Sequence, residues 1–316
     1  MPYLRVYNNI IHTSIVIISA VILPCIYFVG NKADIIRKLK DHHIEFLLFI
    51  SRNLSPPDLQ FVDLEFRKDI SIEAIASQRV ALIEYPGNYN VELKSIHIHQ
   101  LKLAQPLSSH LMSAVWAMFA KRDARICNAH REVNSSGQFY HVYKSSLFLR
   151  EGFFRALEEN YESPSLVSDF FPPGINFVGI HRVYCLVQPS QEQDNYSLVI
   201  FDIEKKCFFV LYSDWEASSL PQHLLQRNTI LSNKLNGFLN SNAVFDGVRG
   251  NNAWVIKDSF GKMKFPPNQT DFDSGIYVFL FAYFAVNDCP IIFNSADILR
   301  IRKLLAYWLL NEYFPM

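Results

Sequence analysis

The stretch "PPNQTDFDSGIYVFLF", residues 266–281, joins a polar loop that opens with two prolines to a segment that is apolar on every side. The apolar part continues to residue 286, and a helix of this composition has no polar face to present to water. We therefore expect a buried helix over residues 274–286, with Ser274 and Gly275 in its first turn. Since polar groups are costly to bury at a helix start, this start is a candidate functional position.

The composition is that of a globular protein with a large core. The chain has 316 residues, of which 50% are hydrophobic and 19% charged, enough for one large domain or two small ones. The 30 basic and 30 acidic side chains balance, which argues against a nucleic-acid-binding protein. The 5 cysteines are scattered and form no CxxC pair, so we expect no disulfide framework, metal site or cofactor.

The N-terminal part contains an uncharged run, "IIHTSIVIISAVILPCIYFV", over residues 10–29. At about 1.5 Å per residue, a helix of this length crosses a hydrocarbon core of about 30 Å. Basic residues are denser after the run than before it, which places the rest of the chain in the cytosol. We expect residues 1–30 to form the transmembrane segment of a single-pass membrane protein. A buried N-terminal helix or a mis-assigned start of the chain are the alternatives.

The sequence pattern of the remaining chain changes at about residue 80. Residues 31–79 have helical spacing of apolar side chains as far as Pro56-Pro57, and we interpret them as a helical connector. Residues 80–316 mix strand and helix patterns. They include a strand in "RVALIEYP", a helix in "PLSSHLMSAVWAMFAKR" capped by Ser108 or Ser109, and a second helical run near 146–160.

The C-terminal half continues this mixture of strands and helices. The sequence "NYSLVIFDIEKKCFFVLYSDW" has two apolar runs around a polar turn, which indicates a hairpin. A helical stretch is expected near 219–239, and residues 295–313 are typical of an amphipathic helix with its basic residues in solvent.

These stretches, in this order, resemble the ubiquitin-like-protein proteases, the SUMO-deconjugating (Ulp-type) cysteine peptidases. "VYKSSLFLREGFFRAL" resembles the family segment that usually contains "Ser-Ser-Phe-Phe", and "NYSLVIFDIEKKCFFVLYSDW" is similar to "His-Trp-x-Leu-x-Val-Ile-Asp…Lys…Tyr-Asp-Ser". "PPNQTDFDSGIYVF" resembles "Pro-Gln-Gln-x-Asn-x-x-Asp-Cys-Gly-Ile/Val-Tyr/Phe", and "DILRIRKLLAYWLL" is similar to the closing arginine-containing helix. The resemblance covers residues from about 80 to 313.

The resemblance implies a papain-like α+β fold, in which a mixed sheet packs on a buried central helix. In the family, the nucleophilic cysteine opens that helix. The helix dipole and unsatisfied N–H groups there favour a thiolate, and the following glycine lets a backbone N–H approach the reacting carbonyl. The resemblance also implies a ubiquitin-like modifier, SUMO-like, or its conjugates as partner.

Every chemical position departs from the family pattern. The nucleophile position holds Ser274, the general-base position Asn195, and the third position Ser213, with the acid displaced to Asp214. The oxyanion glutamine position falls on Asn268. A serine needs a base to take its proton, and an amide cannot supply one. On a strand, a shift of one residue turns a side chain to the opposite face, so Asp214 replaces Ser213 only through a bulge.

Three positions keep the character needed to hold the modifier's extended C-terminal tail. Tyr196 retains an aromatic side chain where the family uses tryptophan to roof the tail tunnel, and Gly275 and Asp273 are also retained. For Asp273, a simpler interpretation is an N-cap-like acceptor for the helix that begins at Ser274.

We therefore expect a pseudoprotease that binds a modifier without cleaving it. Two alternatives stay open: an active hydrolase with a rearranged site of Ser274, Asp214 and His181, and a scaffold protein that has lost modifier binding. Cys185, Cys207 and Cys289 lie in apolar runs and are interpreted as core residues.

Overall fold

The computed structural model describes residues 55–85, 89–102, 105–135, 145–149, 152–163, 165–171, 175, 177–188, 195–213, 222–248, 250, 252–257, 263–268 and 272–312. The chain divides into two compact units, Met1–Asn53 and Leu54–Met316. All described residues belong to the second unit, and the following account concerns that unit.

The structure corrects the expected membrane anchor. No helix in the described ranges is both long enough and apolar enough to cross a membrane. The segment 10–29, on which the expectation rested, lies outside those ranges. The transmembrane helix in the fold class, the membrane as a partner and the description as a single-pass protein are therefore not supported. The physical reason is that length and hydropathy favour a bilayer span and a helix buried in protein alike.

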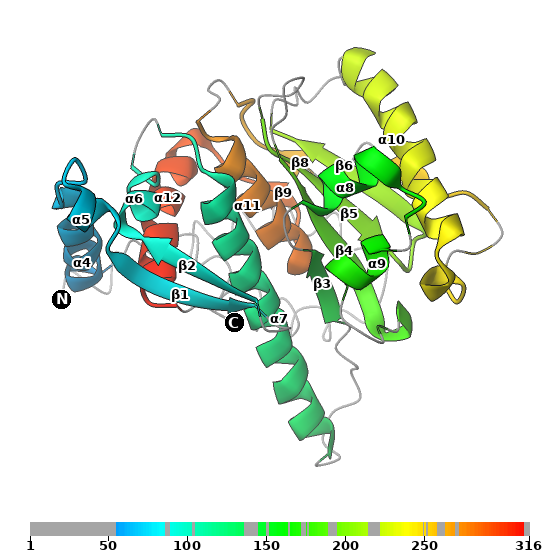
Figure 1. The fold of residues 1–316 in the computed structure, drawn as a ribbon, viewed down its shortest axis with the longest axis horizontal. Coiled ribbons are helices and arrows are strands. Elements are labelled where there is room, and N and C mark those ends of the chain that lie inside the picture. The colour runs from blue at the N-terminus through cyan, green and yellow to red at the C-terminus, as the bar shows by residue number, and fades with distance from the viewer. Residues whose placement is uncertain are drawn as a thin grey trace, which may run out of the picture. The chain divides into compact units, whose positions relative to one another are not determined.

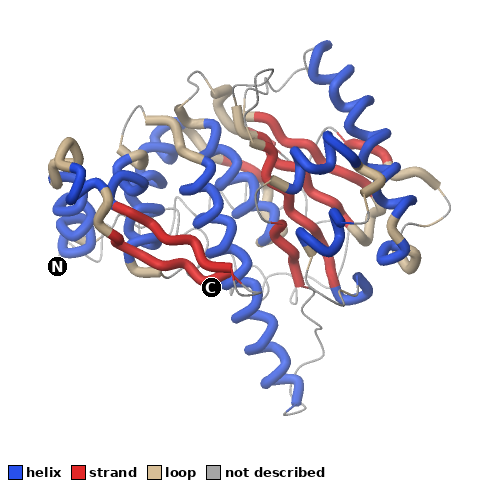
Figure 2. The backbone as a smooth tube through the Cα atoms, viewed as in Figure 1, coloured by secondary structure: helices blue, strands red, loops and turns tan. Residues whose placement is uncertain are grey.

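A mixed five-stranded sheet forms the centre of the unit, in the order β3-β4-β5-β6-β7. Its strands are β3 (Ser145–Leu149), β4 (Ile180–Val187), β5 (Ser197–Asp202), β6 (Cys207–Tyr212) and β7 (Val255–Lys257). β4, β5 and β6 are antiparallel to one another, whereas β3 and β7 pair in parallel with their neighbours. The β5–β6 pair confirms the hairpin expected from the sequence. Figure 2 shows the sheet apart from the hairpin of β1 and β2.

One face of the sheet is covered by α8 (Phe153–Asn160), α9 (Ser165–Phe170) and α10 (Gln222–Ser241), as Figure 1 shows. Alternate strand residues point to this face because successive side chains of a strand alternate. They join a continuous core with the helices, which includes Val183, Val199 and Phe208 from the strands and Phe238 from α10. The helical stretch expected near 219–239 is confirmed as α10.

The other face is covered by α7 (Ser109–Ser135) and α11 (Ser274–Val286). Aromatic rings connect the layers: Phe148 of β3 stacks on Tyr184 of β4 and on Phe119 of α7, and Phe119 meets Phe279 of α11. Every residue of α11 from Ser274 to Ala285 is buried. The buried central helix and its bounds, expected from its uniform hydrophobicity, are confirmed.

Most of the remaining elements pack on the side of α7 and α11 away from the sheet. They are the antiparallel pair β1 (Arg79–Tyr85) and β2 (Tyr89–Lys94), and the helices α4 (Pro56–Arg67), α5 (Glu73–Ala76), α6 (Ser95–His99) and α12 (Ser295–Leu310). The short pair β8 (Met263–Lys264) and β9 (Ile291–Ile292) lies beside α11. Two short 3-10 turns cover Phe177–Gly179 and Ala243–Phe245. Ser108 Oγ accepts the N–H of Leu111, so the expected cap of α7 is confirmed at Ser108.

One expectation fails, and another lies partly outside the described residues. Pro56 and Pro57 begin α4, because proline lacks an N–H group and therefore suits the first turn, where none is needed. The residues before Ser55, which contain the helical run that the prolines were expected to end, lie outside the described ranges. The helical run expected near 146–160 is divided: Ser145–Leu149 pairs with β4, and α8 begins only at Phe153. Gly152, with φ of 86°, turns the chain between them.

A glycine inside α10 gives a test of the packing on the outer face. A Cβ added at Gly237 would lie 2.3 Å from Cε2 of Tyr161, whereas one added at Gly247 would meet nothing within 4 Å. Alanine normally stabilises a helix interior relative to glycine by about 1 kcal/mol. We expect Gly237→Ala to lower the free energy of unfolding by about 1–3 kcal/mol because of overlap with the Tyr161 ring. Gly247→Ala should change it by less than about 0.5 kcal/mol. Urea denaturation compares the two, and a stabilising Gly237→Ala would contradict the packing.

Candidate active site

The first turn of α11 is buried against the start of α7. Ser274 is 2% exposed. A Cβ added at Gly275 would lie 2.9 Å from Cδ1 of Leu107 and 3.1 Å from Sδ of Met112. Gly275 therefore permits a close approach of the two helices, in addition to any role its N–H has in binding.

Two strand ends bring further predicted site residues to one edge of the sheet. Ser197, at the start of β5, pairs with Tyr212, at the end of β6. Because the strands are antiparallel, Asn195 and Tyr196 before β5 lie at the same edge as Ser213 after β6. The Tyr196 side chain is buried, and its hydroxyl donates to the carbonyl oxygen of Leu107 at 3.1 Å. Through Leu107, the aromatic position and the first turn of α11 are neighbours.

Ser213 and Asn268 are in direct contact. The backbone N–H of Asn268 donates to the Ser213 carbonyl at 2.9 Å, and Asn268 Nδ2 donates to Ser213 Oγ at 3.3 Å. The hydroxyl of Tyr277, in the first turn of α11, donates to the carbonyl of Pro266 at 2.9 Å. The loop 265–268 is thus fixed between β6 and α11. Asp214, which the sequence analysis interpreted as the displaced acid, lies outside the described residues.

Asn195, which the sequence predicted at the general-base position, carries an unsatisfied acceptor. Its side-chain Oδ1 is buried and has no hydrogen-bond partner in the described part of the chain. A buried acceptor without a donor costs about 1–3 kcal/mol, so such atoms often mark a site that another group completes. No spacing in the sequence could have revealed this, because it depends on packing at the sheet edge.

Asp273 does not cap α11, and that interpretation of its side chain is wrong. The side chain makes no capping bond to the helix. Its Oδ1 accepts from Arg302 of α12, from Nε at 2.9 Å and from Nη2 at 2.7 Å. A charge-assisted pair of bonds from a guanidinium is stronger than a bond from a neutral backbone N–H, so the arginine takes the carboxylate.

Arg302 corrects a second expectation, that the basic residues of α12 are solvated. It is 1% exposed. Besides Asp273, its guanidinium donates to four backbone carbonyls, those of Phe272 (2.6 Å), Gln100 (3.1 Å), Lys102 (3.2 Å) and Gln105 (3.2 Å). The sequence did carry a signal: Arg302 lies four residues after buried Ile298 and three before buried Leu305, on the apolar stripe of the helix.

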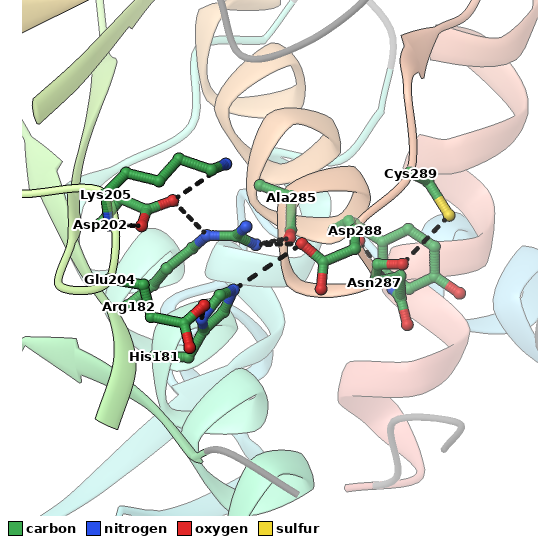
Figure 3. A network of polar contacts seen from close by, with 10 residues as sticks. His181, Arg182, Asp202, Glu204, Lys205, Ala285, Asn287, Asp288 and Cys289 are labelled. Atoms are coloured by element: carbon green, nitrogen blue, oxygen red, sulfur yellow. Dashed lines mark hydrogen bonds and ion pairs between the residues drawn. The ribbon is translucent and has the colours of Figure 1, made fainter. Parts of the chain in front are cut away.

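The far end of α11 holds a different polar network, drawn in Figure 3. Buried Arg182 donates to the carbonyl of Ala285 at 2.8 Å and pairs with Asp202 at 3.2 Å. His181 Nδ1 lies 3.1 Å from Glu204, and its Nε2 lies 3.8 Å from Asp288, which follows α11. Since α11 spans 13 residues, His181 stands about 20 Å along the helix from Ser274. The structure therefore does not bring Ser274 and His181 together.

The cysteines of the apolar runs are core residues, as the sequence suggested. Cys185, Cys207 and Cys289 are buried. Burial raises the pKa of the Cys289 thiol to about 12 and also raises the pKa values of Cys185 and Cys207. These thiols stay protonated near neutral pH and are poor nucleophiles.

The Arg302 network can be tested by substitution on one helix. We expect Arg302→Met to lower the free energy of unfolding by about 3–5 kcal/mol, because it removes two charge-assisted bonds to the Asp273 carboxylate and the bonds to several buried carbonyls. Arg302→Lys should lower the free energy of unfolding by less than Arg302→Met does, because the ammonium keeps the charge but lacks the planar arrangement of donors. The control is Lys303→Met in the same turn, whose pair with Asp63 at 3.5 Å is half-exposed and should contribute less than about 1 kcal/mol. Chemical denaturation measures all three, and equal losses for Arg302→Met and Lys303→Met would refute the network.

Comparison with known proteins gives a match in structure but not in sequence. No family model matches the chain, and no curated protein matches it. Among solved structures, it is similar to the C-terminal Ulp1 protease domain in complex with Smt3, the yeast ortholog of SUMO. That match has 14% identity and a TM-score of 0.58, and it covers 83% of this chain and 97% of the other.

Two further structures agree. The Ulp1-like SUMO protease catalytic domain of Chaetomium thermophilum matches with 13% identity, a TM-score of 0.59 and coverage of 84% and 92%. The SUMO protease Ulp1 with its catalytic cysteine oxidised to a sulfenic acid matches with 12% identity, a TM-score of 0.57 and coverage of 83% and 97%. The resemblance found in the sequence is confirmed at the level of the fold. The described unit of this chain has the α+β fold of the Ulp1-type SUMO protease catalytic domain.

Proposed function

We propose that this chain is a catalytically degenerate member of the Ulp-type family that binds a ubiquitin-like modifier, SUMO or a relative, without cleaving it. The observation that carries the proposal is the start of α11. Ser274 is buried at the start of α11, and we assign it to the nucleophile position of the fold and Asn195 to the base position. On this assignment, the chain keeps the fold and lacks the groups for the chemistry.

The chemical argument rests on proton transfer. A serine hydroxyl has no useful anionic fraction near neutral pH, so it attacks a carbonyl only when a base removes its proton. An amide side chain has no accessible pKa and cannot do this. Four histidines have described side chains: His181 lies at the other end of α11, His97 and His99 belong to α6, and His110 of α7 is bonded through Nε2 to the carbonyl of Glu92. This arrangement disfavours the rearranged hydrolase.

The binding argument rests on what the site retains. Tyr196 is a buried aromatic fixed by its bond to Leu107, and Gly275 keeps the first turn of α11 close to the same residue. We assign the modifier's tail to this region. Asp273 acts there through its backbone, since Arg302 holds its carboxylate. The unsatisfied Oδ1 of Asn195 is an acceptor that a backbone N–H of the bound tail can satisfy.

If the chain binds a modifier, the two substitutions of Tyr196 should weaken that binding to different extents. We expect Tyr196→Ala to weaken modifier binding by about 1–3 kcal/mol, the usual loss for a buried aromatic anchor at an interface. Tyr196→Phe keeps the ring and removes only the hydroxyl that contacts Leu107, so it should cost no more than about 1 kcal/mol. Titration calorimetry with SUMO- and NEDD8-like proteins measures both. Absence of binding by the unmodified chain would refute the proposal and leave a scaffold role.

Restoration of the family residues tests the assignment of the chemical positions. Ser274→Cys alone should stay nearly inert, because Asn195 is neither a base nor an imidazolium partner for the thiolate. Ser274→Cys with Asn195→His should react with a modifier that carries a C-terminal electrophile, giving a covalent adduct in mass spectrometry. Adding Ser213→Asp should increase the rate by orienting the new imidazole.

Two outcomes would contradict the degenerate assignment. Turnover by the unmodified protein that Ser274→Ala abolishes would show a working serine nucleophile. Rapid adduct formation by Ser274→Cys alone would show that another base stands beside the helix.

A further inference from the structure

Three histidines lie on α6 and the first turn of α7: His97 and His110 contact each other, and His99 contacts α4. His97 and His99 are on α6, and His110 is on α7. The contacts of His97 and His99 favour the neutral form of both side chains, and the residue after His99, Gln100, connects α6 to the Arg302 network.

His97 is held in its neutral form by the start of α6. The backbone N–H of Lys94, the residue that precedes the helix, donates to His97 Nδ1 at 3.1 Å. Nδ1 can accept this bond only while it carries no proton. Protonation would set two N–H groups against each other and remove the bond at the helix start.

His110 adds a second restraint on His97. The two rings lie with centroids 4.4 Å apart and planes 43° from parallel. His110 Nε2 donates to the carbonyl of Glu92 at 2.6 Å. Two imidazolium ions this close repel each other, and the charge of Lys94 on β2 acts in the same direction, while the carboxylate of Glu92 opposes it.

His99 is held in its neutral form by burial. It is 3% exposed, and its Nε2 donates to the carbonyl of Glu65 on α4 at 2.8 Å. Its Nδ1 is buried and has no partner in the described part of the chain. The ring of Phe66 and the charges of Lys68 and Lys102 are its neighbours, and a positive charge is favoured by the bond to the Glu65 carbonyl and by the Glu65 carboxylate, which is itself 2.6 Å from Lys68.

The pKa directions agree with this geometry. Burial lowers the pKa of His97, and repulsion from His110 and Lys94 lowers it further. Burial also lowers the pKa of His99, against the opposing effect of its bond to Glu65.

Gln100, the residue after His99, connects α6 to α7 and α12. Gln100 accepts from Ser108 through its side-chain Oε1, from N at 3.0 Å and from Oγ at 2.7 Å. Its carbonyl accepts from Arg302. α6 therefore contacts α4 through His99, the start of α7 through Gln100 and α12 through Arg302.

We propose that α6 is an acid-sensitive latch: it joins α4, α7 and α12 while His97 and His99 are neutral, and proton uptake by these two side chains releases it. The direction follows from linkage. Because the folded state holds these histidines neutral, the unfolded state binds more protons, so their contribution to stability is complete well above the ordinary histidine pKa of about 6.5 and is lost as the pH falls through it. Between pH 7.5 and 5.5 the folding equilibrium constant falls by up to about tenfold for each of the two.

The test compares the full chain with a variant that cannot take up these protons. His97→Asn keeps an acceptor for the Lys94 N–H, and His99→Gln keeps a donor for the Glu65 carbonyl. Urea denaturation at pH 7.5 and 5.5 should show a fall in the folding equilibrium constant that is up to about a hundredfold smaller in the double variant. His181→Gln is the matched control, since His181 lies between the carboxylates of Glu204 and Asp288 and far from α6. It should not reduce the acid sensitivity.

Two measurements on the unmodified chain keep the proposal testable should the double variant not fold. Hydrogen exchange, corrected for the intrinsic effect of pH, should increase in residues 95–102 between pH 7.5 and 5.5 before it increases in α11. NMR titration of the imidazole nitrogens should show that His97 and His99 take up protons only as α6 opens. Equal acid sensitivity of the double variant and the unmodified chain, or protonation of both histidines with α6 still protected, would overturn the latch.

Discussion

The pair of Arg302 and Asp273 is the interaction on which the arrangement of this unit most depends. A guanidinium that is 1% exposed is tolerated only when its donors are satisfied, and the Asp273 carboxylate together with the carbonyls of two chain segments satisfies them. One segment leads into α11, and the other leads from α6 to α7. The arginine thereby sets the position of the helix start relative to Leu107 and Tyr196.

A second buried arginine fixes the other end of α11 by a directional bond. Arg182 of β4 donates to the carbonyl of Ala285 in the last turn, where unpaired carbonyls and the helix dipole favour a cation. The apolar surface of α11 is nearly uniform, and hydrophobic burial is non-directional, so burial alone fixes neither the axial position nor the rotation of the helix. The two arginines, one at each end, supply the directional bonds that do.

The sequence predicted the elements better than it predicted the polar contacts. The bounds of α11, the β5–β6 hairpin and the cap of α7 follow from local patterns, and these were correct. The roles of Asp273 and Arg302 were missed because an ion pair across 29 residues leaves no local pattern, and a lone cation on an apolar stripe resembles a solvated one. The contact of Ser213 with Asn268 could not be predicted either, because the two residues are 55 positions apart in the sequence.

The residues at the chemical positions fit the fold for a reason that is independent of catalysis. A charged acid and base at a buried sheet edge must offset a large desolvation cost by precise mutual contacts. Ser213 and Asn268 are neutral and bond to each other, and Tyr196 bonds to a backbone carbonyl, so none of them requires a charged partner. On the proposed assignment, Ser213 and Asn195 stand in place of an acid and a base, which relieves the cost and leaves the directional contacts at both ends of α11 unchanged. The loss of chemistry that we propose therefore requires no loss of the scaffold, and the buried, unpaired oxygen of Asn195 is the one polar atom at these positions that the described structure leaves for a ligand to satisfy.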